Sequence, residues 1–245
     1  MGKTCVVLIT LVLLAAGCLF LIPLETAGSS KPSSESSALD SDSADVLLNV
    51  PYRSQENTLP TGCELVSAMM VLDYSGASVT PEQMVAHTPV QRLAAGEDGA
   101  LSGPHPDRAF VGDPRTPYGY GCYPPVLKTA LESLLDSRYQ VQDRTGSSLS
   151  KLAKDYLDQS VPVLIWATID MQPSSPGSVW TVEDTGQTFT WTRPEHCLVL
   201  TGYSETQYYF NDPYRSNGRV SYPRALVEQR FQELGKRALA VIRAK

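Results

Sequence analysis

One apolar run in the middle of the chain limits what the fold can be. The segment "VPVLIWATI", residues 161–169, is hydrophobic almost without interruption. It has the length of a strand rather than of a helix. A strand without polar alternation has no face for water, so the run predicts a central, buried strand. The chain must therefore supply further strands around it.

Short strand patterns divided by turn residues follow this run. Residues 178–183 and 188–193 flank "DTGQ" and predict a hairpin. A closing helix is expected over residues 224–235. The remaining segments with strand patterns are 196–203, 207–213, 218–223 and 237–242.

The half of the domain before this run is predicted to be helical, with amphipathic patterns over residues 61–74, 80–87, 124–136 and 148–159. The second of these has Thr80 as N-cap, Pro81 at the first helical position and Gln83 closing a capping box. Helices first and strands afterwards indicate segregated layers. We expect one α+β domain over residues 46–245, with a helical N-terminal half packed on an antiparallel sheet, and we find no internal repeat.

The N-terminus has a different composition. Lys3 precedes an uncharged apolar run over residues 5–24, which is long enough to cross a bilayer as a helix. Residues 1–27 are therefore expected to be a signal peptide or a signal anchor. Residues 28–45 are rich in Ser and Asp and lack aromatic residues, which predicts a disordered linker. The domain is expected outside the cytoplasm, secreted or held at the membrane by this segment.

A lipid anchor at Cys18 is the weaker alternative for the leader. The stretch "LAAGC" resembles a bacterial lipoprotein box. Ala15 stands where such boxes usually carry leucine, however, and the apolar run continues past Cys18. The net charge of −6 gives no support for nucleic-acid binding.

A long segment dominated by Gly, Pro and Asp, residues 96–125, divides the predicted helices. Structureless loops of this length are uncommon unless they are functional. The segment is expected either to cover a substrate groove or to be a surface insertion packed by Phe110, Tyr118 and Tyr120.

The chain has five cysteines, two of which lie in the leader. The other three are Cys63, Cys122 and Cys197, and an odd number leaves at least one thiol unpaired. A disulfide between Cys122 and Cys197 is one possibility that spacing does not decide.

Cys63 is the first candidate for chemistry. In "TGCE", Thr61 and Glu64 fit a capping box that would place Cys63 in the first turn of a helix. Free backbone N–H groups and the helix dipole favour a thiolate there and can bind an oxyanion. Free cysteine is also among the most buried residue types, so a core role for Cys63 stays open.

A nucleophilic cysteine needs a base, and His196 is the histidine best placed for this role. It opens a predicted strand, whereas His87 ends a short helix and His105 lies between two prolines. Asp212 ends the next strand, from which it could bond His196 Nδ1 and orient the ring. Asp212 before Pro213 could also be a turn residue, and Asn211 is the fallback orienter.

Gln55 could complete such a site. A side-chain amide shortly before the nucleophile's helix can donate to an oxyanion together with the Cys63 N–H. A metal site is not expected because the cysteines and histidines lack a short ligand spacing. No phosphate-binding loop and no cofactor are expected, and the three tryptophans, Trp166, Trp180 and Trp191, are expected in the core or in a groove wall.

Five motifs in order, "LNVPYRSQ", "PTGCELVSAMMVLDY", "GYGCYPPVL", "HCLVLTGY" and "FNDP", resemble the C39-like cysteine peptidases of the bacteriocin-processing type. The similarity runs from about Leu48 to about Val241. It implies a papain-like fold, with Cys63 as nucleophile, His196 as base, Asp212 as orienter and Gln55 in the oxyanion hole.

The chain departs from the processing peptidases, which are fused to an ATP-driven exporter and cut after a double glycine. It is more similar to the stand-alone extracytoplasmic members of Gram-positive bacteria, so that specificity is not carried over. The sequence predicts a monomeric thiol hydrolase of peptide bonds, with cell-wall peptides among the candidate substrates. An acyl transferase with the same site and a non-catalytic surface module remain alternatives.

Overall fold

The computed structural model describes residues 45–244, and strand β7 (Val163–Thr168) lies inside its main sheet. Every residue of β7 is buried, as the apolar run predicts. The main sheet has seven strands, and six of them follow the order β12-β11-β10-β7-β13-β6, while β1 pairs with β10. All of these pairings are antiparallel. The other strands of this sheet are β1 (Val46–Leu47), β6 (Tyr139–Asp143), β10 (Glu195–Tyr203), β11 (Gln207–Asp212), β12 (Gly218–Pro223) and β13 (Ala238–Arg243).

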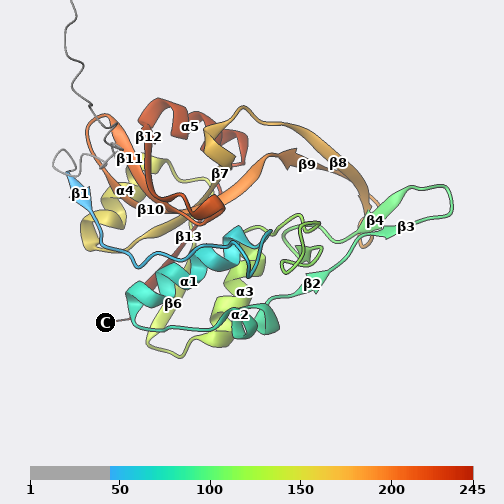
Figure 1. Ribbon diagram of the computed structural model, residues 1–245, viewed down its shortest axis with the longest axis horizontal. Coiled ribbons are helices and arrows are strands. Elements are labelled where there is room, and N and C mark those ends of the chain that lie inside the picture. Colours follow the sequence, from blue (N-terminus) through green and yellow to red (C-terminus); the bar gives the residue numbers. More distant parts are fainter. Residues whose placement is uncertain (1–44, 245) are drawn as a thin grey trace, which may run out of the picture. The chain divides into compact units, whose positions relative to one another are not determined.

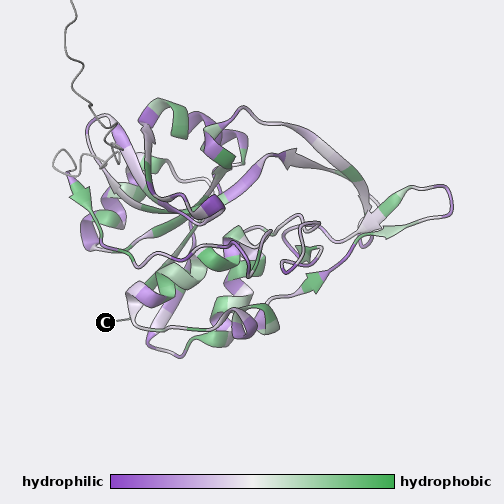
Figure 2. Ribbon diagram, viewed as in Figure 1, coloured by the Kyte–Doolittle hydropathy of each residue, from purple (hydrophilic) through white to green (hydrophobic). Residues whose placement is uncertain are grey.

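The helices lie on both sides of this sheet. Helices α1 (Cys63–Ser75) and α3 (Pro124–Leu134) cover one face, and α5 (Arg224–Glu233) covers the other (Figure 1). Helix α1 is hydrophobic along most of its length and packs against β10, β7 and β13 (Figure 2). The two remaining helices are α2 (Pro81–His87) and α4 (Leu149–Asp155), and short 3-10 turns follow at Leu157–Gln159, Ile169–Met171 and Tyr214–Ser216.

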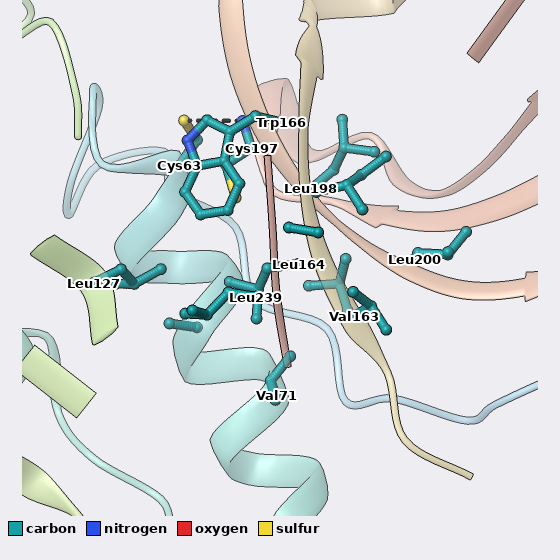
Figure 3. Close-up of a cluster of buried hydrophobic side chains, with 14 of the residues drawn as sticks. Cys63, Val71, Leu127, Val163, Leu164, Trp166, Cys197, Leu198, Leu200 and Leu239 are labelled. Carbon is teal, nitrogen blue, oxygen red and sulfur yellow. Dashed lines mark hydrogen bonds between the residues drawn. The ribbon is translucent and has the colours of Figure 1, made fainter. Parts of the chain in front are cut away.

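The core of the domain lies between α1 and the central strands. Figure 3 shows Leu164 of β7 and Leu239 of β13 close to Val71 of α1, with Cys63 at the end of this cluster. The α+β prediction is therefore confirmed. The predicted helix over residues 148–159 is divided at Tyr156, whose φ of −122° is not helical.

A second sheet was not expected. The predicted hairpin forms as β8 (Ser175–Val182) and β9 (Thr188–Arg193), but it belongs to a separate sheet of order β3-β4-β8-β9. Its short strand β4 (Leu101–Gly103) comes from the Gly- and Pro-rich segment 96–125, and β3 (Ala94–Ala95) lies just before that segment. A further two-stranded sheet pairs β5 (Phe110–Val111), also from this segment, with β2 (Val90–Gln91).

This second sheet holds two of the tryptophans in the core, as expected. Trp180 and Trp191 are buried, and the Trp191 ring stacks on Tyr123 with 5.7 Å between ring centroids. Tyr120 packs against both tryptophans, and Phe110 is fully buried. Tyr118 is 85% exposed, so it does not help to pack this segment. The alternative of a surface insertion packed by Phe110, Tyr118 and Tyr120 is therefore wrong for Tyr118.

Strand β10 carries one extra residue relative to β11. Leu200 pairs with Phe210 and Gly202 pairs with Tyr209, so Thr201 has no partner position on β11. This is a β-bulge, which shifts the pairing by one residue along the strand. Gly202 also lets the backbone of β1 approach, because a Cβ there would overlap the carbonyl oxygen of Val46.

The predicted leader (residues 1–27) and nearly all of the predicted linker (residues 28–45) lie outside the described residues. Between residues 45 and 244, no helix combines the length and the hydrophobicity needed to span a membrane.

The capping box of α2 provides a test of local stability. The Thr80 side chain accepts from Gln83 N at 3.2 Å, and the Gln83 side chain accepts from Thr80 N at 2.9 Å, as predicted. Thr80→Ala is expected to lower the free energy of unfolding by about 1 kcal/mol, because it removes an N-cap. Urea denaturation measures this loss. Thr145→Ala, at an exposed turn, is the control, and an equal loss in both variants would contradict the role of the cap.

Candidate active site

The four residues singled out in the sequence lie around the N-terminal end of α1. Cys63 is the first residue of α1, His196 is the second residue of β10 and Asp212 is the last residue of β11. Gln55 lies in the segment before α1, and its backbone N–H donates to Pro213 O at 3.0 Å. All four side chains are buried.

His196 and Asp212 form a direct, buried hydrogen bond. The bond joins His196 Nε2 to Asp212 Oδ1 at 2.6 Å, and the two side chains are 2% and 1% exposed. The expectation that Asp212 meets Nδ1 is wrong. The pairing between β10 and β11 ends at Val199 and Asn211, and Asp212 lies one residue beyond it. From there Asp212 bonds Nε2, the ring nitrogen that is farther from the backbone.

The surroundings of Asp212 keep it ionised. Burial acts to raise its pKa, but hydrogen bonds from His196, from Asn217 Nδ2 at 3.0 Å and from Tyr214 N at 2.9 Å hold the pKa below its usual value. A carboxylate can only accept hydrogen bonds, so His196 Nε2 must carry the proton of this bond. In the neutral ring, Nδ1 then holds the lone pair that can accept a proton.

The Cys63 thiol is in contact with the strand of His196. Cys197 N donates to Cys63 Sγ at 3.3 Å, and Sγ donates to Glu64 Oε2 at 3.3 Å (Figure 3 draws the first of these bonds). Within residues 45–244, no hydrogen bond joins Sγ to the His196 ring. Cys197, the residue after the predicted base His196, therefore binds the Cys63 thiol, whereas the His196 ring does not.

The predicted capping box at Cys63 is wrong. The N-cap of α1 is Gly62, and no side chain caps the helix. The Thr61 hydroxyl donates to Thr116 O at 2.9 Å in the loop that packs beside it. Glu64 turns into the core, where its Oε1 accepts from Cys122 N at 2.6 Å. Tertiary contacts have taken both side chains that the local pattern assigned to the cap.

The sequence predicted that the start of the helix would favour a Cys63 thiolate, but the surroundings of this thiol have the opposite effect. Burial raises the pKa of the Cys63 thiol well above its usual value, and the nearby charges of Glu64 and Glu195 raise it further. The hydrogen bond from Cys197 N acts in the opposite direction. These surroundings favour the thiol form of Cys63, so ionising it requires a proton acceptor.

Two acidic residues beside Cys63 were not found from the sequence as site residues. Glu64 directly follows Cys63 and is fully buried, and Glu195 directly precedes His196 and is 8% exposed. The Cys63 Sγ and one carboxylate oxygen of each glutamate lie within 4.8 Å of one another. The signal available in the sequence was this adjacency of each glutamate to a predicted site residue.

This trio is the one group among the described residues whose atoms converge closely enough to hold a metal ion. Both oxygens of Glu64 and the Cys63 Sγ already have partners within the protein. The trio is therefore a hydrogen-bonded acid cluster.

Gln55 is oriented toward the start of α1. Its Nε2 donates to Pro60 O at 2.7 Å, and its Oε1 is buried without a partner among the described residues. A primary amide has two N–H groups, so one donor remains after the bond to Pro60. The Cys63 N–H lies in the first turn of α1, where backbone donors have no intrahelical partner.

The other candidates are engaged elsewhere. Asn211, the fallback orienter, donates to Val50 O at 2.9 Å. His87 pairs with Ser133, and His105 lies 3.3 Å from an Asp107 oxygen. Cys122 and Cys197 are free, buried thiols, so the disulfide between them is absent.

The arrangement contains the parts of a thiol-based acyl-transfer site. A cysteine lies at a helix start, an imidazole is oriented by a carboxylate on the neighbouring strand, and amide donors lie near the thiol. These groups can supply a nucleophile, a base and oxyanion donors, respectively.

The chain belongs to the Peptidase_C39 like family, whose model matches residues 47–239. It is 30% identical over 184 residues to the uncharacterized protein YvpB of Bacillus subtilis (strain 168), covering 75% of this chain and 70% of that protein. A crystal structure from Bacillus anthracis, described provisionally as a C39-like peptidase, is also similar. It shows 28% identity and a TM-score of 0.70 over 82% of this chain and 98% of that one. The predicted family and the papain-like fold are confirmed.

The pKa of Asp212 predicts how stability depends on pH. Because the folded pKa is depressed, ionised Asp212 contributes stability above its unfolded pKa of about 4, and this is lost as the pH falls through the folded value. Asp212→Asn is therefore expected to be less stable than the wild type at pH 7, with the gap narrowing below about pH 4. Urea unfolding at pH 7, 5 and 3 measures the gap. Asp158→Asn, at an exposed residue, is the control, and a gap that stays constant with pH would contradict the prediction.

Proposed function

We propose that the protein is a thiol peptidase in which Cys63, His196 and Asp212 carry the reaction. The observation behind the proposal is the buried His196–Asp212 bond next to a helix-start cysteine that hydrogen-bonds the residue after that histidine. Membership of a peptidase-like family supports peptide bonds as the substrate. No cofactor enters the proposed reaction.

The proposed reaction begins with a proton transfer. His196 Nδ1 takes the Cys63 proton, and the ionised Asp212 stabilises the resulting imidazolium through Nε2. The thiolate sulfur then attacks the carbonyl carbon, and the carbonyl electrons move to the oxygen. The imidazolium returns the proton to the leaving amine as the C–N bond breaks, which leaves an acyl-enzyme. Water, deprotonated by His196, hydrolyses the thioester and regenerates the thiol.

Two donors are proposed to stabilise the negative oxygen. The Cys63 N–H and the free N–H of Gln55 both face the region at the start of α1. The bond from Gln55 N to Pro213 O joins this segment to the chain just after Asp212. One connection thus fixes the position of the donor relative to that of the orienter.

Substitution of the proposed residues tests the mechanism. Cys63→Ala and His196→Ala are expected to lower kcat/KM on a cleaved peptide by at least about 10³-fold, and Gln55→Ala by about 10²-fold. Peptide-library profiling by mass spectrometry identifies the peptide, and rates on it are then compared.

The matched control for His196→Ala is His87→Ala, at an exposed histidine bound to Ser133. Full activity in Cys63→Ala would contradict the proposal. The same assay with an added amine separates hydrolysis from acyl transfer, because a transferase forms the amine adduct. A protein that cleaves no peptide, and whose Cys63 reacts no faster than a denatured thiol, would be a binding module.

We further propose that the peptidase domain acts outside the cytoplasm. The support is the apolar run over residues 5–24 followed by the Ser- and Asp-rich residues 28–45. Residues 1–45 fused to alkaline phosphatase are expected to give activity in bacterial cells, because this reporter is active only after export. Replacing two leucines of the run by arginine should abolish the activity. Equal activity of both fusions would contradict export by this segment.

A further inference from the structure

The buried acid cluster beside Cys63 is not used by the proposed mechanism. Burying two carboxyl groups together is costly unless they are neutralised or paired. Glu64 and Glu195 flank the two residues proposed to exchange a proton, which makes the state of these acids relevant to the thiol.

The bonds of Glu64 assign different roles to its two oxygens. Oε1 accepts the Cys122 N–H at 2.6 Å, so it acts as an acceptor. Oε2 lies 3.3 Å from Cys63 Sγ. A neutral carboxylic acid has one carbonyl oxygen and one O–H, and this geometry fits a carbonyl at Oε1 and a hydroxyl at Oε2.

A glycine makes the first of these bonds possible. Gly121 has a φ of +146°, and a Cβ at this position would overlap Glu64 Oε1 and lie 3.2 Å from Glu195 Oε2. The backbone before Cys122 thus lies directly against both acids. Water therefore has no room between this backbone and the two carboxyl groups.

Glu195 shares this buried site with Glu64. Its Oε1 is buried without a partner among the described residues, and its carboxyl group lies beside that of Glu64. Two carboxylates in a dry site repel each other, so the pair holds at least one proton. Arg237 is the cation that acts on Glu195, and it offsets only part of the burial.

The two glutamates hold their protons with different strengths. Burial raises the pKa of Glu64 to about 7, despite the opposing hydrogen bond from Cys122 N. Burial, followed by the charge of Glu64, raises the pKa of Glu195 well above its usual value. The titratable and charged groups that face the pair come from α1, the segment before α3, β10 and the segment before β13: Cys63, Cys122, Tyr123, His196, Cys197 and Arg237.

We propose that Glu64 is a further catalytic residue, a neutral carboxylic acid whose O–H donates to the Cys63 thiolate. The inference rests on the proposed function, because it concerns the thiolate formed when His196 takes the Cys63 proton. The thiolate then receives two hydrogen bonds, from Cys197 N and from Glu64 Oε2. The Glu64 proton stays on Oε2 throughout, and only the Cys63 proton moves.

Ionising Glu64 removes one donor and places a negative charge beside the sulfur. The thiolate–imidazolium pair should therefore lose stability as the pH rises through the pKa of Glu64. The charge of Glu64 raises the pKa of Glu195, so Glu195 is still protonated when Glu64 ionises. Replacing Glu64 should therefore move the midpoint of this loss, and replacing Glu195 should leave it in place.

Alkylation of Cys63 by iodoacetamide between pH 4 and 10 tests the inference without a known substrate. The purified full chain is treated, and labelling is read in the tryptic peptide of residues 54–92, which contains Cys63 as its one cysteine. The wild type is expected to show a plateau of reactivity at acidic pH that falls as the pH rises through about 7. At high pH the rate rises again through simple ionisation of the thiol.

Three variants separate the roles of the glutamates. Glu64→Gln keeps both the donor and the acceptor, so its plateau should extend at least one pH unit higher than that of the wild type. Glu64→Met removes the donor, and its plateau rate should fall at least tenfold. Glu195→Gln is the matched control, because Glu195 is still protonated when Glu64 ionises, and its plateau should end at the same pH as that of the wild type.

The outcomes distinguish this inference from the proposed function. A wild type without a plateau, with the same profile as His196→Ala, would contradict the thiolate–imidazolium pair itself. A wild-type plateau that Glu64→Gln and Glu64→Met leave unchanged would contradict the inference about Glu64 alone. A plateau that extends as far in Glu195→Gln as in Glu64→Gln would contradict the assignment of the midpoint to Glu64. If Glu64→Met fails to fold, by circular dichroism, the comparison of Glu64→Gln with Glu195→Gln still decides.

Discussion

The site depends on an edge of β10 that β11 leaves unpaired. Pairing between these strands ends at Val199 and Asn211, two residues before Pro213, which has no N–H to continue the ladder. The backbone of Cys197 is instead bonded by α1, because its N–H donates to Cys63 Sγ and its C=O accepts from Ser67 Oγ at 3.1 Å. One unpaired peptide position thus attaches the start of the helix to the strand that carries His196.

The features predicted correctly from the sequence are those that short segments determine by themselves. The apolar run marked β7, the capping box marked α2, and the strand positions of His196 and Asp212 brought these two side chains together. The prediction that Asp212 bonds His196 Nδ1 was wrong. The ring nitrogen that Asp212 reaches depends on where the pairing between β10 and β11 ends. A sequence pattern specifies the strands, but it does not specify the last bond of their ladder.

The features that were missed depend on contacts between distant segments. The Thr61 hydroxyl bonds a carbonyl 55 residues later, and Glu64 Oε1 bonds an N–H 58 residues later, so the local capping pattern was misleading. The second sheet was missed because β4 has three residues and pairs in parallel with β8, far along the chain. Short strands of this kind carry little periodicity of their own.

The bulge at Thr201 has a consequence for how the family can vary. Side chains alternate between the two faces of a strand, so a shift of one residue exchanges the faces. Deleting Thr201, the unpaired residue, would leave Leu200 opposite Phe210 and Val199 opposite Asn211, so His196 and Asp212 would keep their register. Deleting Phe210 while keeping the turn would instead move Asp212 by one position relative to His196 and turn it to the opposite face of the sheet. Away from the bulge, this hairpin should therefore tolerate changes in length poorly over evolutionary time. The turn between β8 and β9, which lies in the other sheet, has no such coupling to His196 and Asp212, and insertions there should be better tolerated.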